Sequence, residues 1–227
     1  MALFSHHLSR QYSDRTEYWK ARTRSRQGTD SSGQRELVII LDSVDHGKFH
    51  YPRDEGLGAK DFSNWIRPCL TCTGVIVHGV ATFLFLSEDF VVKDSSWACE
   101  LLAHVLHVVD EGGIDLRDCT IWVQSDNASK ECKNNTMMRI LAGLVVTRRC
   151  RAARLCCLQS GHSHEDIDQW FSGLSSYITA CDNLSTPADF VESLQVWMNG
   201  AGSRKDEAIK KCILVDQTRA WQLGMCI

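Results

Sequence analysis

The aliphatic run at residues 37–41 is the feature that most constrains the fold of this chain. Every position in the run is apolar, polar residues precede it, and it ends at Asp42. A strand exposed on one face alternates apolar and polar residues, whereas a strand buried on both faces is apolar throughout. The run therefore predicts a central strand of a sheet, with Asp42 at its carboxyl end.

Further strand and helix patterns follow this run in a definite order. The predicted strands span 73–80, 81–86, 120–124 and 154–158, with one more candidate strand at 211–215. Apolar residues at helical spacing, with capping signals at their ends, predict helices at 94–109, 134–147, 163–177 and 186–198. Three successive strands indicate an antiparallel meander, and the later alternation indicates parallel crossovers. The order predicts an α/β fold with a mixed five-stranded sheet flanked by helices.

The chain of 227 residues suits one large domain with extensions. Residues 1–35 are predicted to form a helical extension at 5–27 and a polar linker at 28–35. We expect the main domain at 36–180 and a C-terminal extension at 181–227.

Charge and cysteine content bear on whether the protein binds DNA and on the cellular compartment it occupies. The formal net charge of −3 argues against strong non-specific DNA binding, although basic segments occur at 10–26 and 148–154. The 11 cysteines are scattered, and no secretory signal or membrane-length apolar run occurs in the sequence. We therefore expect reduced thiols in a nuclear or cytoplasmic protein that is neither secreted nor membrane-spanning.

Three carboxylates occupy positions that a mixed sheet can bring together. Asp42 ends the first predicted strand, Asp126 follows the fourth, and Asp168 lies in the first turns of the helix after the fifth. Three such groups can hold two Mg²⁺ or Mn²⁺ ions, which activate a water and stabilise the leaving oxygen in phosphodiester cleavage. The sequence therefore predicts a metal-dependent catalytic site made of Asp42, Asp126 and Asp168.

Two neighbouring aspartates are alternatives to these ligands. Asp166 lies three residues after Ser163, close to a capping-box spacing, so a structural role is available to it and Asp168 is preferred. Asp45 lies in the turn after the first strand, whereas Asp42 ends the strand directly and is preferred. Both choices stay open at the level of sequence.

Three segments carry a resemblance to a known family. The segment at 125–135 contains Asp-Asn followed by Glu-Cys-Lys-Asn, and the segment at 159–171 reads Gln-Ser-Gly-His-Ser-His-Glu-Asp-Ile-Asp-Gln-Trp-Phe. Together with the opening motif at 41–53, they resemble a transposon-derived family of domains of unknown function. The resemblance covers roughly residues 36–180.

The resemblance implies a ribonuclease-H-like fold and an ancestor of the DDE transposase type. Asp42, Asp126 and Asp168 fall on the acidic triad of that family, with Asp in place of the third Glu that is common in DDE enzymes. Supporting motif positions are occupied by Asn127, Lys133, His162 and His164. Lys133 and the two histidines are then expected to contact a phosphate or to orient the third acid.

Two functions follow as hypotheses. The first is a two-metal nuclease or polynucleotidyl transferase-like domain, active or decayed, that acts on DNA phosphodiesters and is compatible with a homo-oligomer. The second is a domesticated, catalytically inactive module that binds protein or nucleic acid. The near-neutral charge and the lack of a recognisable DNA reader before residue 36 favour the second hypothesis.

Overall fold

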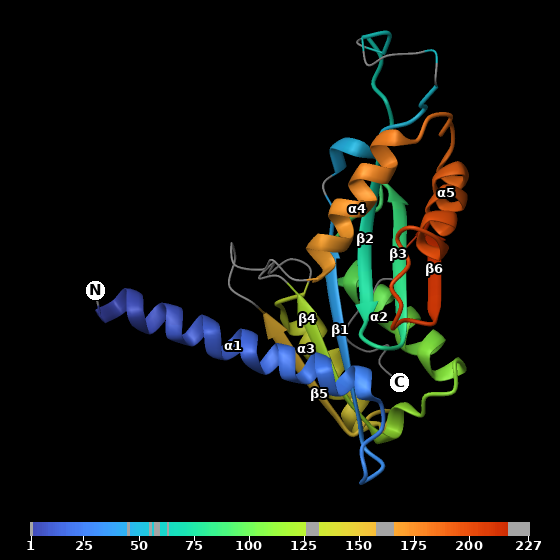
Figure 1. Ribbon diagram of the computed structural model, residues 1–227. Coiled ribbons are helices and arrows are strands. Elements are labelled where there is room, and N and C mark those ends of the chain that lie inside the picture. The colour runs from blue at the N-terminus through green and yellow to red at the C-terminus, as the bar shows by residue number, and fades with distance from the viewer. Residues whose placement is uncertain are drawn as a thin grey trace.

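The described parts of the protein form a mixed sheet with helices on both faces (Figure 1). The computed structural model describes residues 2–44, 46–54, 56, 60–62, 64–125, 132–157 and 166–217, without the side chains of 2–8, 10, 11 and 46.

The sheet has six strands in the order β5-β4-β1-β2-β3-β6. The strands are β1 (Arg35–Ser43), β2 (Leu70–Val77), β3 (Ala81–Glu88), β4 (Cys119–Ser125), β5 (Ala152–Cys157) and β6 (Ile209–Leu214). Strand β2 is antiparallel to both β1 and β3, while β4 is parallel to both β1 and β5. The mixed sheet, the meander and the crossovers are confirmed, but the predicted count of five strands is wrong.

The sixth strand, β6, comes from the candidate segment at 211–215 and pairs in parallel with β3. The local sequence pattern indicates a short strand here, and Cys212 is buried, but the pattern does not indicate which strand it pairs with. Parallel pairing needs a long crossover, here supplied by α5 (Pro187–Asn199), and such a non-local contact leaves no local sequence signature. The segment after 181 therefore extends the sheet.

Two hydrophobic cores lie on opposite faces of the sheet. Leu37 and Ile39 of β1 face the core under α2 (Ser95–Glu111) and α3 (Asn135–Val146). Val38 and Ile40 face the core under α1 (Ala2–Gln27), α4 (Asp166–Ala180) and α5. This alternation confirms that the aliphatic run is a central strand buried on both faces. Two short 3-10 turns, η1 (His46–Lys48) and η2 (Leu116–Asp118), complete the elements.

Helix α4 lies close over β2 beside the end of β1. A Cβ on Gly74 would stand 2.5 Å from Phe171 Cε1, so only glycine allows this approach. Trp170 of α4 stacks on Trp197 of α5 with ring centroids 5.6 Å apart, and its Nε1–H donates to the Gly202 carbonyl at 2.9 Å. Because Gly74 pairs with Asp42 across the β1–β2 ladder, α4 is held next to the position of Asp42.

The carboxyl-terminal half of α1 packs on the sheet, whereas its amino-terminal half extends away from the body (Figure 1). Tyr18, Ala21 and Ser25 are buried, and the Ser25 hydroxyl donates to the His78 carbonyl at 2.7 Å. Among the helices of the described residues, none combines the length and the apolar character needed to cross a membrane.

Candidate functional site

Asp42 lies at the carboxyl end of β1 among polar side chains. Its Oδ1 accepts the Ser43 backbone N–H at 2.8 Å. The Ser43 and Thr73 hydroxyls are 3.1 Å apart, and Lys93 Nζ donates to Ser43 Oγ at 3.4 Å. Trp97 Nε1–H donates to Thr73 Oγ1 at 3.3 Å, which fixes the hydroxyl from the α2 side. This end of β1 therefore carries hydrogen-bonding groups and a cation around a carboxylate.

A cavity of about 150 Å³ opens beside Asp42. It is also lined by Ser43, Thr73, Ser125 and Cys132. At about 30 Å³ for each water, such a space holds roughly five waters, enough for a partly hydrated ion or a phosphate oxygen. Ser125 is the last residue of β4, so this cavity joins the ends of the two parallel strands.

Several predicted site residues lie outside the described part of the chain. These are Asp126, Asn127, His162 and His164, together with the alternative Asp45. Within the described ranges, no group of three or more His, Cys, Asp or Glu side chains is arranged to hold a metal ion. Asp126 lies outside these ranges, so the triad as a whole stays a prediction.

Asp168 is half-buried on α4. A helix turns by about 100° per residue, so Asp168 stands about 200° from Trp170, whereas Asp166 stands on the Trp170 side. Trp170 faces α5, which packs along β6 and β3. The Asp168 flank of α4 therefore points away from the side that packs on α5.

Lys133 is exposed in the short segment before α3. It precedes Asn134, whose side chain caps α3 by accepting the Met137 N–H at 3.0 Å. The cap fixes the backbone next to Lys133, and the phosphate-binding role of this lysine stays a prediction.

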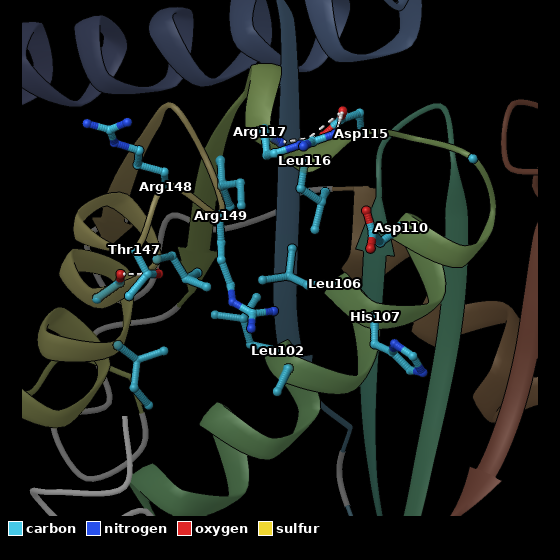
Figure 2. Close-up of a pocket in the computed structure, with 16 residues that line it drawn as sticks. Leu102, Leu106, His107, Asp110, Asp115, Leu116, Arg117, Thr147, Arg148 and Arg149 are labelled. Carbon is cyan, nitrogen blue, oxygen red and sulfur yellow. Dashed lines mark hydrogen bonds and ion pairs between the residues drawn. The ribbon is translucent and has the colours of Figure 1, made fainter. Parts of the chain in front are cut away.

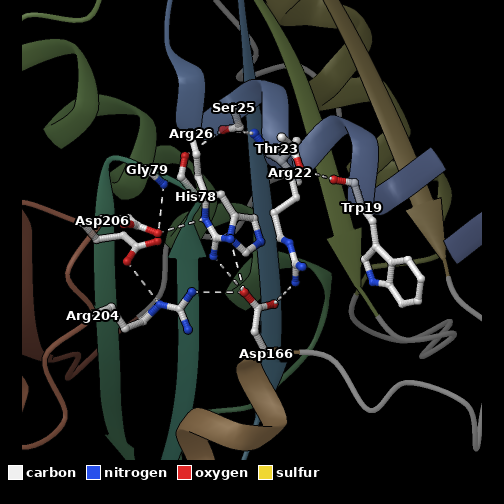
Figure 3. Close-up of polar contacts among 12 residues, drawn as sticks. Trp19, Arg22, Thr23, Ser25, Arg26, His78, Gly79, Asp166, Arg204 and Asp206 are labelled. Carbon is white, nitrogen blue, oxygen red and sulfur yellow. Dashed lines mark hydrogen bonds and ion pairs between the residues drawn. The ribbon is translucent and has the colours of Figure 1, made fainter. Parts of the chain in front are cut away.

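Asp166 has a different environment, because three arginines surround its carboxylate (Figure 3). Arg204 Nη2 and Arg26 Nη2 lie 3.0 Å and 3.3 Å from Asp166 Oδ2, and Arg22 Nη1 lies 3.4 Å from Oδ1. Arg22 and Arg26 belong to α1, while Arg204 follows α5. Asp166 therefore ties α1 and the segment after α5 to the start of α4. Asp166 thus has a structural role, as the centre of an ion-pair network.

His78 completes this network from the turn between β2 and β3. The ring is fully buried, its Nε2 lies 2.9 Å from Tyr18 Oη, and its Nδ1 lies 3.6 Å from Asp166 Oδ2. Burial lowers the pKa of His78 from 6.5 to about 3, and the nearby arginines add to this effect against the pull of Asp166. The imidazole is therefore neutral at neutral pH, and its contact with Asp166 is dipolar.

The carboxylate of Asp166 stays ionised in the same network. Burial alone would raise its pKa, but the charges of a protonated His78 and of the Arg204 and Arg22 guanidinium groups outweigh burial and lower the pKa. At neutral pH His78 is neutral and the arginines are charged, so the arginines supply this effect there. A buried negative charge with three cations is thus held together at the N-terminus of α4.

The neutral His78 makes stability depend on pH. The unfolded histidine titrates near 6.5 and the folded one near 3, so the unfolded state binds more protons between these values. Stability is full above pH 6.5 and is lost as the pH falls toward 3. We expect the free energy of unfolding to fall by about 2 kcal/mol between pH 6.5 and pH 5.

Urea unfolding at a series of pH values measures this loss. In the His78→Gln variant, which cannot titrate, the share of the slope due to His78 should disappear even if the variant is less stable. An unchanged slope in His78→Gln would show that the acid sensitivity has another origin.

The cysteines in the described residues are all free thiols, as expected for reduced side chains. Burial raises the pKa of Cys119 to about 11 and that of Cys212 to about 12. These two thiols therefore stay protonated at neutral pH and serve as small apolar core residues.

Sequence reasoning missed His78 and Lys93. His78 follows an aliphatic strand and precedes Gly79, and a lone histidine at a strand end reads as an ordinary turn residue. Lys93 lies one residue before the N-cap Asp94, a position that points to no ligand. Only the folded arrangement brings these side chains to Asp166 and Ser43, respectively.

The fold and the site define a mixed α/β domain with a carboxylate at the joined ends of two parallel central strands. Comparison with known sequences adds the family: the chain belongs to the family described as "Domain of unknown function (DUF7869)", whose sequence model matches residues 62–220. The match covers β2 to β6 and begins after Asp42. No curated protein and no solved structure gives a significant match.

Proposed function

We propose that this protein is a transposase-derived, ribonuclease-H-like domain that cleaves or transfers DNA phosphodiesters with two Mg²⁺ or Mn²⁺ ions. Asp42, Asp126 and Asp168 are the proposed metal ligands. Lys133, Asn127, His162 and His164 support the site as phosphate contacts or as groups that orient the acids.

The observation that carries the proposal is the pairing of β1 with β4. The two strands are adjacent and parallel, and their last paired residues are Ile40 and Gln124. In the sequence, Asp42 and Asp126 each come two residues after these partners. Parallel neighbours end at the same edge of a sheet, which is where ligand sites of open α/β sheets lie. This register supports a shared site for the two acids.

The placement of α4 supports the third ligand. The helix lies over β2 beside the pair formed by Gly74 and Asp42, and Asp168 lies in its first turn. By strand alternation, Asp42 follows Val38 and Ile40 on the face of the sheet that α4 covers. Asp42 and Asp168 are therefore on the same face.

The residues present fit a site for hard divalent cations. Carboxylate oxygens are the ligands that Mg²⁺ and Mn²⁺ prefer, and Asp42 borders a small cavity whose other polar lining residues are Ser43, Thr73 and Ser125, with apolar residues of α2 on its opposite wall. Bound ions would supply an activated water and stabilise the leaving oxygen. Lys93, which donates to Ser43, supplies a cation for a phosphate at the same end of the strands.

The sheet order supports the ribonuclease-H-like part of the proposal. The assignment itself comes from the resemblance, and the meander β1-β2-β3, with β4 and β5 added in parallel beside β1, is compatible with it. Strand β6 extends the sheet at the other edge and leaves the ends of β1 and β4 uncovered by further pairing.

Thermal melting with EDTA, Mg²⁺ and Mn²⁺ tests the metal site. An ion at a hundred times its Kd stabilises the folded state by about 2.7 kcal/mol, which for a domain of this size is roughly 5–10 °C in Tm. We expect such a rise in the parent and its loss in Asp126→Asn. Asp118→Asn, an exposed aspartate in the turn before β4, is the matched control and should respond like the parent.

A parent protein that melts at the same temperature with and without metal would contradict the proposal. The inactive interaction module would then be the better explanation of the fold. An equal metal response in the parent and in Asp126→Asn would place any ion outside the proposed triad.

A further inference from the structure

A large groove lies between α2 and α3, on the face of the sheet opposite α4 (Figure 2). Its volume is about 1060 Å³, at the upper end of the range of small-molecule sites. Aliphatic side chains of both helices, of β4 and of η2 form its floor, namely Leu102, Leu106, Leu116, Ile121, Ile140 and Leu144. The groove thus has an aliphatic floor, with charged side chains along its rim.

One guanidinium group points into this groove. The Arg149 side chain runs from the turn after α3 down between the two helices, whereas Arg148 points away from the groove (Figure 2). Within the described part of the chain, neither arginine side chain has a hydrogen bond or an ion pair. Arg149 is therefore a cation in an apolar groove without a carboxylate partner.

The other charges at the rim are mostly compensated within the chain. Arg117 Nη2 lies 2.6 Å from Asp115 Oδ2, so these two opposite charges pair with each other. Asp110 lies on the α2 rim, across the groove from Arg149 (Figure 2). The groove thus presents a positive charge at its centre and a negative charge at one rim.

Gly143 keeps the groove open on the α3 side. It lies inside the helix and lines the groove, and a Cβ built at this position would meet nothing within 4 Å. A glycine inside a helix costs about 1 kcal/mol relative to alanine, so local helix stability does not account for it. Space at this position is what the glycine provides.

We propose that the groove between α2 and α3 binds a small amphiphilic anion. Its apolar body lies on the aliphatic floor, and its carboxylate or phosphate accepts hydrogen bonds from the Arg149 guanidinium, which matches such planar oxyanions. The charge of Asp110 keeps the anionic head away from the α2 rim and so sets the orientation. This site is independent of the proposed metal centre.

Isothermal titration calorimetry with dodecanoate and dodecyl phosphate, below their micellar concentrations, tests the proposal. Dodecanol and dodecyltrimethylammonium have the same apolar body without the negative charge. We expect one saturable site for one or both anions, and binding of the two other compounds that is weaker by about ten- to hundredfold. Response to only one anion identifies the head group, and saturable binding of neither overturns the proposal.

Two variants assign the site to the groove. Arg149→Gln should weaken anion binding by about ten- to hundredfold, while Arg148→Gln, which makes the same charge change one residue away, should leave it within about twofold. An equal effect of the two variants, or equal affinity for dodecanol and dodecanoate, would overturn the specific role of Arg149.

Gly143→Leu places a side chain in the groove, where a Cβ meets nothing within 4 Å, and adds a better helix former. We expect it to melt no lower than the parent and to lose binding of the alkyl anions. A well-folded Gly143→Leu protein that still binds dodecanoate like the parent would place the ligand elsewhere and contradict the proposal.

Discussion

Replacement of Asp166 by alanine is expected to destabilise the protein by about 3–5 kcal/mol, the usual cost of leaving buried charges without their partner. The Asp166 side chain is only 13% exposed, and the three arginines around it are each 30% exposed or less. Without the carboxylate, Arg22, Arg26 and Arg204 repel one another in a partly desolvated space. The loss should also loosen α1 from α4, because Asp166 joins them.

Denaturant unfolding of Asp166→Ala and of Asp206→Ala measures this cost with a matched control. Among the described residues, Asp206 pairs only with Arg26, and it is 59% exposed, so its removal should cost about 1 kcal/mol or less. A change of that small size in Asp166→Ala as well would show that the network is solvated and does not hold the elements together.

Replacement of Trp170 by alanine should lower the free energy of unfolding by about 3–5 kcal/mol. The ring is buried between Phe171 and Trp197, with ring centroids 6.2 Å and 5.6 Å away, and its N–H is bonded to the Gly202 carbonyl. The variant loses this stacking and leaves a cavity under α4 and α5. Because α4 carries Asp168, the loss should also weaken the proposed metal site.

Trp170→Phe separates the contribution of ring packing from that of the hydrogen bond to the Gly202 carbonyl. It keeps an aromatic ring but leaves the Gly202 carbonyl without its donor, so a cost of about 1–3 kcal/mol is expected. Chemical unfolding of both variants gives the two values. If Trp170→Ala were as stable as Trp170→Phe, packing of this helix against α5 would not be a main source of stability.

The sequence was most informative where local patterns decide the structure. The aliphatic run at 37–41 predicted a central strand, and β1 is indeed buried on both faces. The helical spacing of apolar residues predicted a helix at 163–177, and in α4 the residues Ile167, Trp170, Phe171, Leu174 and Ile178 are all buried. Periodicity alone determines these features, because each depends only on neighbours along the chain.

Features that depend on distant partners could not be predicted in the same way. β6 pairs with β3 across more than a hundred residues of chain, and Asp166 meets arginines from α1 and from the segment after α5. Neither contact changes the local apolar pattern. Likewise, the groove beside α3 appears only when α2 and α3 pack on the same face of the sheet.

For the candidate site, the sequence predicted a shared position for three acids, and that prediction stays untested. Asp42 is the penultimate residue of β1 and borders a small cavity, and Asp168 lies in the first turn of α4. The parallel pairing of β1 with β4 supports a position for Asp126 beside Asp42, but Asp126 itself lies outside the described residues. The shared metal site of the three acids therefore stays a proposal.

Nicking of supercoiled plasmid DNA by the purified protein tests the central proposal most directly. With Mn²⁺ or Mg²⁺, the parent should nick the plasmid, and EDTA should abolish the reaction. Asp126→Asn and Asp42→Asn should lose the activity by on the order of a thousandfold or more, while Asp118→Asn should keep it. A parent that nicks no DNA with either metal, or an Asp126→Asn variant as active as the parent, would contradict the account.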